Sequence, residues 1–139
     1  MASVRTVLCL AALLNLYVSG VDFTNAFLNA PLDEDVYVSA PPSQPPLEHG
    51  YVYKLQRALY GLKQSPRAWN ATLHLYLTSE CGLKRLHSEH CLYMSKDMDS
   101  GSVVIICVYV DDLIIAYSDQ QYFEKFIAVL TSKFKITPP

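Results

Sequence analysis

Two adjacent carboxylates interrupt the most apolar segment of the chain. Asp111 and Asp112 lie in the middle of VVIICVYVDDLIIAYS, which spans residues 103–118. Like charges in contact repel, and burial disfavours an ionised carboxylate. If the flanking apolar runs pair as a hairpin, both aspartates lie at its tip, where one Asp would be an ordinary turn residue. A second Asp in the same turn needs another reason, and a divalent cation would supply one because it cancels the repulsion.

A third carboxylate, Asp22, follows a separate apolar segment, LYVSGV, at residues 16–21. Carboxylate oxygens are the hard ligands that Mg²⁺ and Mn²⁺ prefer. A carboxylate at the end of a strand, beside a hairpin tip that carries two more, is typical of two-metal phosphoryl-transfer sites. The residues alone leave two interpretations open: a metal site of this kind, or aspartates that only form turns and helix caps.

Three helices and several strands are predicted to position these aspartates. Helical spacing predicts a first helix with Ser3 as its N-cap. A second helix is capped by Ser65, has Pro66 at its first position and ends at Gly82. A third is capped by Ser118 or Asp119. The expected buried stripes are Val4, Val7, Leu8, Ala11 and Leu14; then Trp69, Thr72, Leu73, Tyr76 and Leu77; then Phe123, Phe126, Ile127, Leu130 and Phe134. Strands are predicted at residues 16–22, 51–62 (running into a turn at Gly61), 91–96, 102–110 and 112–118. The fold class is therefore α+β, with an antiparallel sheet packed against helices.

Length and composition limit the possibilities further. At 139 residues the chain is long enough for one compact domain and not comfortably for two. A net charge of −2 does not indicate a free-standing nucleic-acid binder, which is usually basic. Residues 39–50, SAPPSQPPLEHG, carry four of the eight prolines and are predicted to form a surface loop.

The first twenty residues allow two interpretations. MASVRTVLCLAALLNLYVSG has an early arginine, an apolar run and small residues at its end, as a secretory signal peptide does. The alternative, which we favour, is a core helix followed by a strand; the run is too short for a transmembrane helix. Four cysteines without a CxxC pair also favour an intracellular location, cytoplasmic or nuclear, over a small secreted cysteine-containing protein.

Four blocks of the chain resemble the reverse transcriptases of copia-type LTR retrotransposons. VYVDDLIIA is similar to their YxDD box, in the YVDD form, and VDFTNAFLNAPLDEDVYVSAPP resembles the segment that holds the first catalytic aspartate. VYKLQRALYGLKQSPRAWNATL and EHCLYMSK are similar to the two blocks between them. The match runs from about Ser3 to Phe134 in the family's order and spacing. LNA in place of an LNG-like turn is a small departure.

The resemblance implies the palm subdomain of an RNA-directed DNA polymerase, a nucleotidyltransferase that uses two Mg²⁺ or Mn²⁺ ions. Asp22 and Asp111 would bridge both ions, Asp112 would complete the carboxylate set, and the backbone carbonyl of Phe23 would be a further ligand. One ion would lower the pKa of the primer 3′-hydroxyl, and the other would hold the deoxynucleoside triphosphate and stabilise the leaving pyrophosphate.

Further site residues follow from the same resemblance. Phe27 would act as a steric gate against a ribose 2′-hydroxyl, with an ordinary core phenylalanine as the alternative. Tyr60 and Gly61 would line the nucleotide pocket. Tyr109 and Val110 would support the primer end, and Val110 is expected to be strained because a β-branched residue occupies a tight turn.

Lys63 and Arg67 lie at the start of the second predicted helix. They would either meet template or primer phosphates, which supply most nucleic-acid affinity, or be only solvated. Trp69, one turn further along, is expected in the core rather than stacked on a base.

A zinc site is the rival metal interpretation. Cys81, His87, His90 and Cys91 cluster in CGLKRLHSEHC. Their spacing is not that of a standard zinc finger, and the adjacent His90 and Cys91 would point to opposite faces of a strand. We therefore do not expect zinc to bind here.

The expected domain organisation is a single partial reverse transcriptase domain over residues 1–139, a palm with part of the fingers. Thumb, connection and ribonuclease H elements, and the basic finger elements that hold a triphosphate, are expected in other parts of a polyprotein. The expected partners are an RNA or DNA template–primer and a deoxynucleotide, with no membrane. The isolated chain is expected to be weakly active or inactive. The alternative function is a noncatalytic relic or interaction module that keeps the palm fold.

Overall fold

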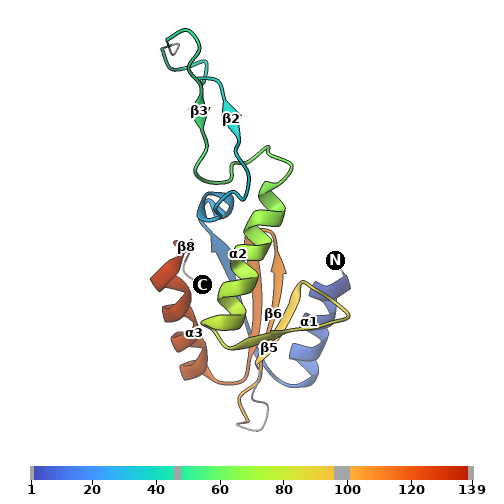
Figure 1. Cartoon of the computed structure of the whole chain (residues 1–139). Helices are drawn as coiled ribbons and strands as arrows, with labels where there is room; N and C mark the ends of the chain where they lie inside the picture. Colours follow the sequence, from blue (N-terminus) through green and yellow to red (C-terminus); the bar gives the residue numbers. More distant parts are fainter. Residues whose placement is uncertain (1, 46–47, 96–100, 138–139) are drawn as a thin grey trace. The chain divides into compact units, whose positions relative to one another are not determined.

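The computed structural model describes residues 2–45, 48–95 and 101–137, and these residues form an α+β fold with a mainly antiparallel sheet (Figure 1). The predicted α+β class with an antiparallel sheet is therefore confirmed. The chain divides into two compact units, residues 1–25 with 73–139 and residues 26–72, and each is described by itself. No described helix is both long and apolar enough to span a bilayer.

A six-stranded sheet forms the larger unit, in the order β4-β5-β6-β7-β1-β8. The strands are β1 (Tyr17–Phe23), β4 (Leu83–Arg85), β5 (Leu92–Ser95), β6 (Val104–Tyr109), β7 (Asp112–Tyr117) and β8 (Ile136–Thr137). Every neighbouring pair is antiparallel. The predicted strands at β1, β5, β6 and β7 are confirmed, whereas β4 and β8 are too short to show a periodic pattern. The turn expected at residues 97–101 lies largely outside the described residues.

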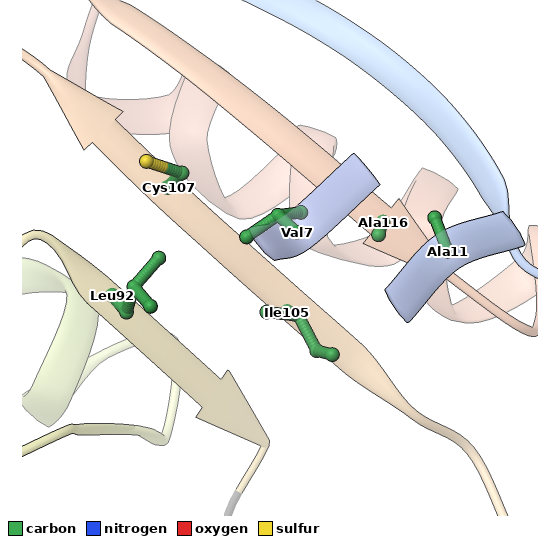
Figure 2. Close-up of a cluster of buried hydrophobic side chains, with 6 residues drawn as sticks. All are labelled: Val7, Ala11, Leu92, Ile105, Cys107 and Ala116. Carbon is green, nitrogen blue, oxygen red and sulfur yellow. The ribbon is translucent and has the colours of Figure 1, made fainter. Parts of the chain in front are cut away.

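Helix α1 (Ala2–Leu13) covers one face of this sheet. Val7 and Ala11 of α1 pack into a buried cluster with side chains of β5, β6 and β7, shown in Figure 2. The strand members of the cluster are Leu92, Ile105, Cys107 and Ala116. The interpretation of the first residues as a core helix is thus the one that the structure shows.

Helix α3 (Gln120–Lys133) covers the opposite face. Tyr117 of β7 points away from the α1 side because it alternates with Ala116, and its ring stacks on Phe123 of α3 at a centroid distance of 4.2 Å. Phe126 and Leu130 of α3 are also buried. Because both faces are covered, β6 is buried from Val104 to Val108 with no polar alternation. This explains why the segment around the paired aspartates is so uniformly apolar.

Helix α2 (Ser65–Ser79) has the expected buried residues Trp69, Leu73 and Leu77. Its C-terminal half joins α3 through the Tyr76 hydroxyl, which donates to the Val129 carbonyl at 2.7 Å. Gly82 has a φ of 67°, as expected of a residue that closes a helix.

Three capping and burial predictions need correction. Ser3 lies inside α1 rather than before it, and its hydroxyl donates to the Glu89 carboxylate at 2.9 Å. Leu8 is exposed because α1 buries only a narrow stripe against the sheet, and Leu14 is exposed because it lies beyond the end of α1. Ser65 was predicted to cap the second helix, but it is the first residue of α2. Its hydroxyl donates a hydrogen bond to the Leu59 carbonyl, before the helix. Asp119, in contrast, is the N-cap of α3 and accepts a hydrogen bond from the Tyr122 N–H at 2.8 Å.

The smaller unit contains a short 3-10 helix, η1 (Ala26–Asn29), and a two-stranded sheet of β2 (Tyr37–Val38) and β3 (Tyr53–Lys54). Of the single strand predicted over residues 51–62, only Tyr53–Lys54 is a strand. Past that point the chain turns to a different partner, since Arg57 bridges Pro31 and the Ala58 N–H donates to the Ala30 carbonyl. The described part of the proline-rich loop is exposed or partly exposed and contains turns, as expected of a surface loop.

A paired substitution in α1 tests its role in the core. Val7 is fully buried and Leu8, its neighbour, is 45% exposed. Val7→Ala should lower the free energy of unfolding by about 2 kcal/mol, because it removes two buried methyl groups and leaves a cavity. Leu8→Ala should change it by less than about 0.5 kcal/mol. Urea denaturation followed by circular dichroism measures both, and equal losses would contradict the packing described for α1.

Candidate active site

A two-residue turn joins β6 to β7 and holds the paired aspartates. Tyr109 and Asp112 are the last paired residues of the two strands, so Val110 and Asp111 form the turn itself. Val110 has a φ of 55°, a left-handed conformation that hairpin turns of this length ordinarily give to glycine or asparagine. A β-branched residue there costs about 1–2 kcal/mol. The strain expected at Val110 is thus present in the backbone.

Asp22 lies directly opposite Asp112 in the antiparallel pairing of β1 with β7. Opposite residues of such a pair project to the same face with their Cβ atoms about 4.5–5.5 Å apart. Both aspartates are exposed. On its other side Asp22 pairs with Thr137 of β8, so the strand that carries this carboxylate is held from both edges.

Asp111 is tied to the end of β1 through its backbone. Its carbonyl accepts a hydrogen bond from the Phe23 N–H at 2.8 Å, and its carboxylate Oδ1 atom is buried. The Phe23 ring, 1% exposed, packs edge-on against Phe134 at a centroid distance of 5.4 Å. The turn and the residue after Asp22 therefore hold each other in place.

The facing aspartates lie at the edge of a hollow of about 470 Å³. Tyr109 also lines this hollow and is 61% exposed. The remaining lining is mainly apolar and comes from α1 and from strands β1, β7 and β8. The structure thus brings carboxylates, an exposed aromatic ring and an apolar surface to one place.

The donors at this tip suit a hard divalent cation in their chemistry and in their register. Asp22 and Asp112 face each other, and Asp111 comes from the adjacent turn. Within the described ranges, however, no three His, Cys, Asp or Glu side chains converge as a ligand cluster. The same holds for the rival zinc residues, and burial together with nearby Glu80 raises the pKa of the Cys81 thiol to about 12. A protonated thiol is a poor zinc ligand, because zinc binds the thiolate.

The smaller unit brings together two other predicted residues. Phe27 is buried, and its ring lies against that of Tyr60 with 4.5 Å between centroids and a tilt of 47°. Gly61 has a φ of 95°, which confirms the turn expected there. Lys63 is exposed, and Arg67 pairs with Asp33 at 2.8 Å in an exposed ion pair.

Six residues of the hollow were not predicted as site residues: Val4, Gly20, Val21, Leu113, Ile114 and Thr137. Val4 and Ile114 look like ordinary core residues in the sequence, and Thr137 lies in a strand too short to predict. Gly20 did carry a signal, since a glycine in the interior of a strand often marks close approach of a ligand or another backbone.

Comparison with known proteins gives a consistent result. The family described as "Reverse transcriptase (RNA-dependent DNA polymerase)" matches residues 1–138. The chain is 36% identical over 135 residues to the retrovirus-related Pol polyprotein from transposon TNT 1-94 of Nicotiana tabacum, covering 96% of this chain and 10% of that protein. It is equally similar to that from transposon RE1 of Arabidopsis thaliana, of which it covers 9%. It is 31% identical over 132 residues to the truncated transposon Ty1-A Gag-Pol polyprotein of Saccharomyces cerevisiae, covering 95% of this chain and 10% of that protein. The chain therefore spans about a tenth of these relatives.

The strain at Val110 can be measured with a matched pair of glycine substitutions. Val110→Gly should raise the free energy of unfolding by about 0.5–1 kcal/mol, because relief of the left-handed strain exceeds the entropic cost of glycine. Val18 of β1 has a similar exposure (46% against 48%) and lies in a strand. Val18→Gly should therefore lower the free energy of unfolding by about 1 kcal/mol. Urea denaturation of both variants is the measurement, and a loss of stability in Val110→Gly would contradict the strain.

The facing carboxylates of Asp22 and Asp112 should repel each other. Neutralising one of them should therefore raise the free energy of unfolding, by an amount that depends on salt. Asp112→Asn should raise the free energy of unfolding by about 0.5 kcal/mol at low salt and without divalent cations. In 1 M salt the gain should shrink, because screening shortens the range of the repulsion to about 3 Å. Glu34→Gln makes the same change of net charge at an exposed site in the smaller unit and should have no comparable effect. A gain that did not respond to salt would show that repulsion is not its cause.

Proposed function

Because the chain belongs to the reverse transcriptase (RNA-dependent DNA polymerase) family, we propose that it is the palm portion of a copia-type enzyme. In this proposal it carries the carboxylates for two-metal transfer of deoxynucleotides to a primer 3′-hydroxyl. The observation that supports this best is the register of Asp22 opposite Asp112 at the edge of the hollow, with Asp111 in the adjacent turn. The six-stranded sheet, with α1 on one face and α3 on the other, would be the palm.

The proposed metal ligands are the carboxylates of Asp22, Asp111 and Asp112 and the backbone carbonyl of Phe23. When bound, the cations would supply the positive charge that activates a hydroxyl nucleophile and neutralises a triphosphate. The protein's own contribution would be to hold these ligands in fixed positions. The hydrogen bond from Phe23 to Asp111 and the packing of Phe23 on Phe134 fix the two chain segments that carry these ligands.

Substrate contacts are proposed for residues of both units. Tyr109 and Val110 are both exposed at the hairpin tip and would support the primer end. The packing of Tyr60 on Phe27 restrains the Phe27 ring, as a steric gate requires, and Gly61 turns the chain beside it.

Lys63 and Arg67 are proposed to meet nucleic-acid phosphates. Lys63 is exposed. The pairing of Arg67 with Asp33 is exposed to solvent, where an ion pair is worth about 1 kcal/mol or less. A phosphate can therefore compete with Asp33 for the guanidinium group.

Metal binding by the 139-residue chain tests this proposal directly. Mn²⁺ titration, followed by water proton relaxation, should give an affinity that falls by at least about tenfold in Asp22→Asn and Asp111→Asn. Asp119→Asn is the matched control, because Asn caps a helix as well as Asp does and Asp119 lies at the start of α3. Equal affinity in all four proteins would contradict the proposal and favour the noncatalytic alternative.

Primer extension on an RNA template with Mg²⁺ then tests catalysis. Extension by the wild-type chain above that of Asp111→Asn would show that the chain itself polymerises. If Mn²⁺ binds through the aspartates and extension does not exceed that control, catalysis by the isolated chain is excluded while the metal site stands.

A further inference from the structure

Two of the four cysteines lie side by side in the larger unit. Cys107 of β6 is 2% exposed and belongs to the buried cluster shown in Figure 2. Cys91 packs against the same cluster from the turn before β5, and its carbonyl accepts a hydrogen bond from the Val108 N–H at 2.8 Å. The fold therefore brings two free thiols to one place beneath α1.

The strand register gives these cysteines a separation that suits a disulfide bond. Leu92 lies directly opposite Cys107, and Cys91 is its neighbour along the chain. One step away from the directly opposite position in an antiparallel pair, Cα atoms are about 6 Å apart, within the roughly 4.4–6.8 Å that disulfides span. Strict alternation would point Cys91 away from Cys107, but Cys91 lies in a turn outside β5 and packs on the Cys107 side.

The two thiols differ in their access to solvent and in their acidity. Cys91 is partly exposed, and its thiol donates a hydrogen bond to the Glu89 carboxylate at 3.3 Å. Burial, together with the nearby Cys91 and a hydrogen bond between the two thiols, raises the pKa of Cys107 to about 11. Because thiol exchange needs an accessible thiolate, an oxidant in solution should react with Cys91 before Cys107.

We propose that Cys91 and Cys107 form a site of reversible thiol–disulfide exchange, with a small disulfide such as glutathione disulfide as the oxidant. In the first step the Cys91 sulfur bonds to one glutathione sulfur, and the S–S bond of the oxidant breaks. The first glutathione leaves and takes the Cys91 proton. In the second step the Cys107 sulfur bonds to the Cys91 sulfur and displaces the second glutathione, which takes the Cys107 proton. Two protein thiols are oxidised, and one glutathione disulfide is reduced to two glutathione molecules.

The new bond would tie β5 to the strand that leads to the hairpin tip. It would lie beside the hydrogen bond that already joins Cys91 to Val108, two residues before Val110. In a reducing compartment the pair would remain as thiols, because disulfides there are usually transient and redox-sensing. This inference concerns other side chains than the aspartate site and does not rest on the proposed function.

Mass spectrometry of the folded 139-residue chain after treatment with glutathione disulfide tests the assignment. All samples carry Cys9→Ser, because Cys9 is exposed and would add an unrelated modification. This parent protein should lose two hydrogen atoms, retain no glutathione and give peptides joined through Cys91 and Cys107 that dithiothreitol separates. Cys81→Ser is the matched control and should behave like the parent, because burial and nearby Glu80 raise the pKa of the Cys81 thiol to about 12.

Two further variants separate the steps. In Cys107→Ala the mixed disulfide of Cys91 with glutathione should persist at least about tenfold longer than in the parent, because the displacing thiol is gone. In Cys91→Ala, Cys107 should remain an unmodified thiol. Circular dichroism checks the fold of each variant, and if Cys107→Ala does not fold, the joined peptides and Cys91→Ala decide the question.

Three results would overturn the site. The first is a parent protein that retains glutathione on Cys91. The second is a parent protein in which Cys91 and Cys107 both stay as thiols. The third is a mixed disulfide that disappears from folded Cys107→Ala as fast as from the parent. None of these results bears on Mn²⁺ binding by the aspartates, so this inference and the proposed function fail separately.

Discussion

The pairing of β1 with β7 is the constraint on which the rest of the site depends. Side chains alternate between the two faces of a strand, so a slip of one residue would send Asp22 to the opposite face from Asp112. The pairing runs without interruption from Tyr17 with Tyr117 to Asp22 with Asp112. Its buried members on the α3 side, such as Val21 and Leu113, are 3% and 1% exposed. Core burial therefore fixes the register, and the register brings together two like charges that would otherwise separate.

Covering the sheet on both sides is what makes this register costly to change. One layer is α1, whose Val7 and Ala11 pack on β6 and β7. The other is α3, whose Phe123 stacks on Tyr117. A chain of this length can bury few strands completely, and the most buried strands, β6 and β7, form the hairpin that carries Asp111 and Asp112. The apolar run that surrounds these aspartates is thus the support for their position.

Much of this arrangement could be predicted from the sequence because the signals were local. Periodicity indicated the three helices, and the apolar runs on either side of Val110 and Asp111 indicated the hairpin. The errors arose where distant residues decide the outcome. Ser3 was expected to cap a helix, but its hydroxyl is bound by Glu89, far away in the sequence. The strand predicted over residues 51–62 stops because residues 30–31 replace β2 as its partner. Gly20 and Ile114 line the hollow because β1 and β7 pair. The strand glycine was a local signal of close approach, but no local pattern identifies Ile114 as the residue opposite it.

The shortest strand of the sheet has a protective effect. Without β8, the hydrogen-bonding groups of Asp22 and Phe23 on that side would form an open sheet edge, and such edges recruit strands from other molecules. Ile136 and Thr137 occupy that edge and join it to the end of α3. Two residues far from Asp22 in the sequence thus keep its strand inside the sheet. A product ending before Ile136 would keep every aspartate and yet expose the strand that bears the first of them to intermolecular β-pairing.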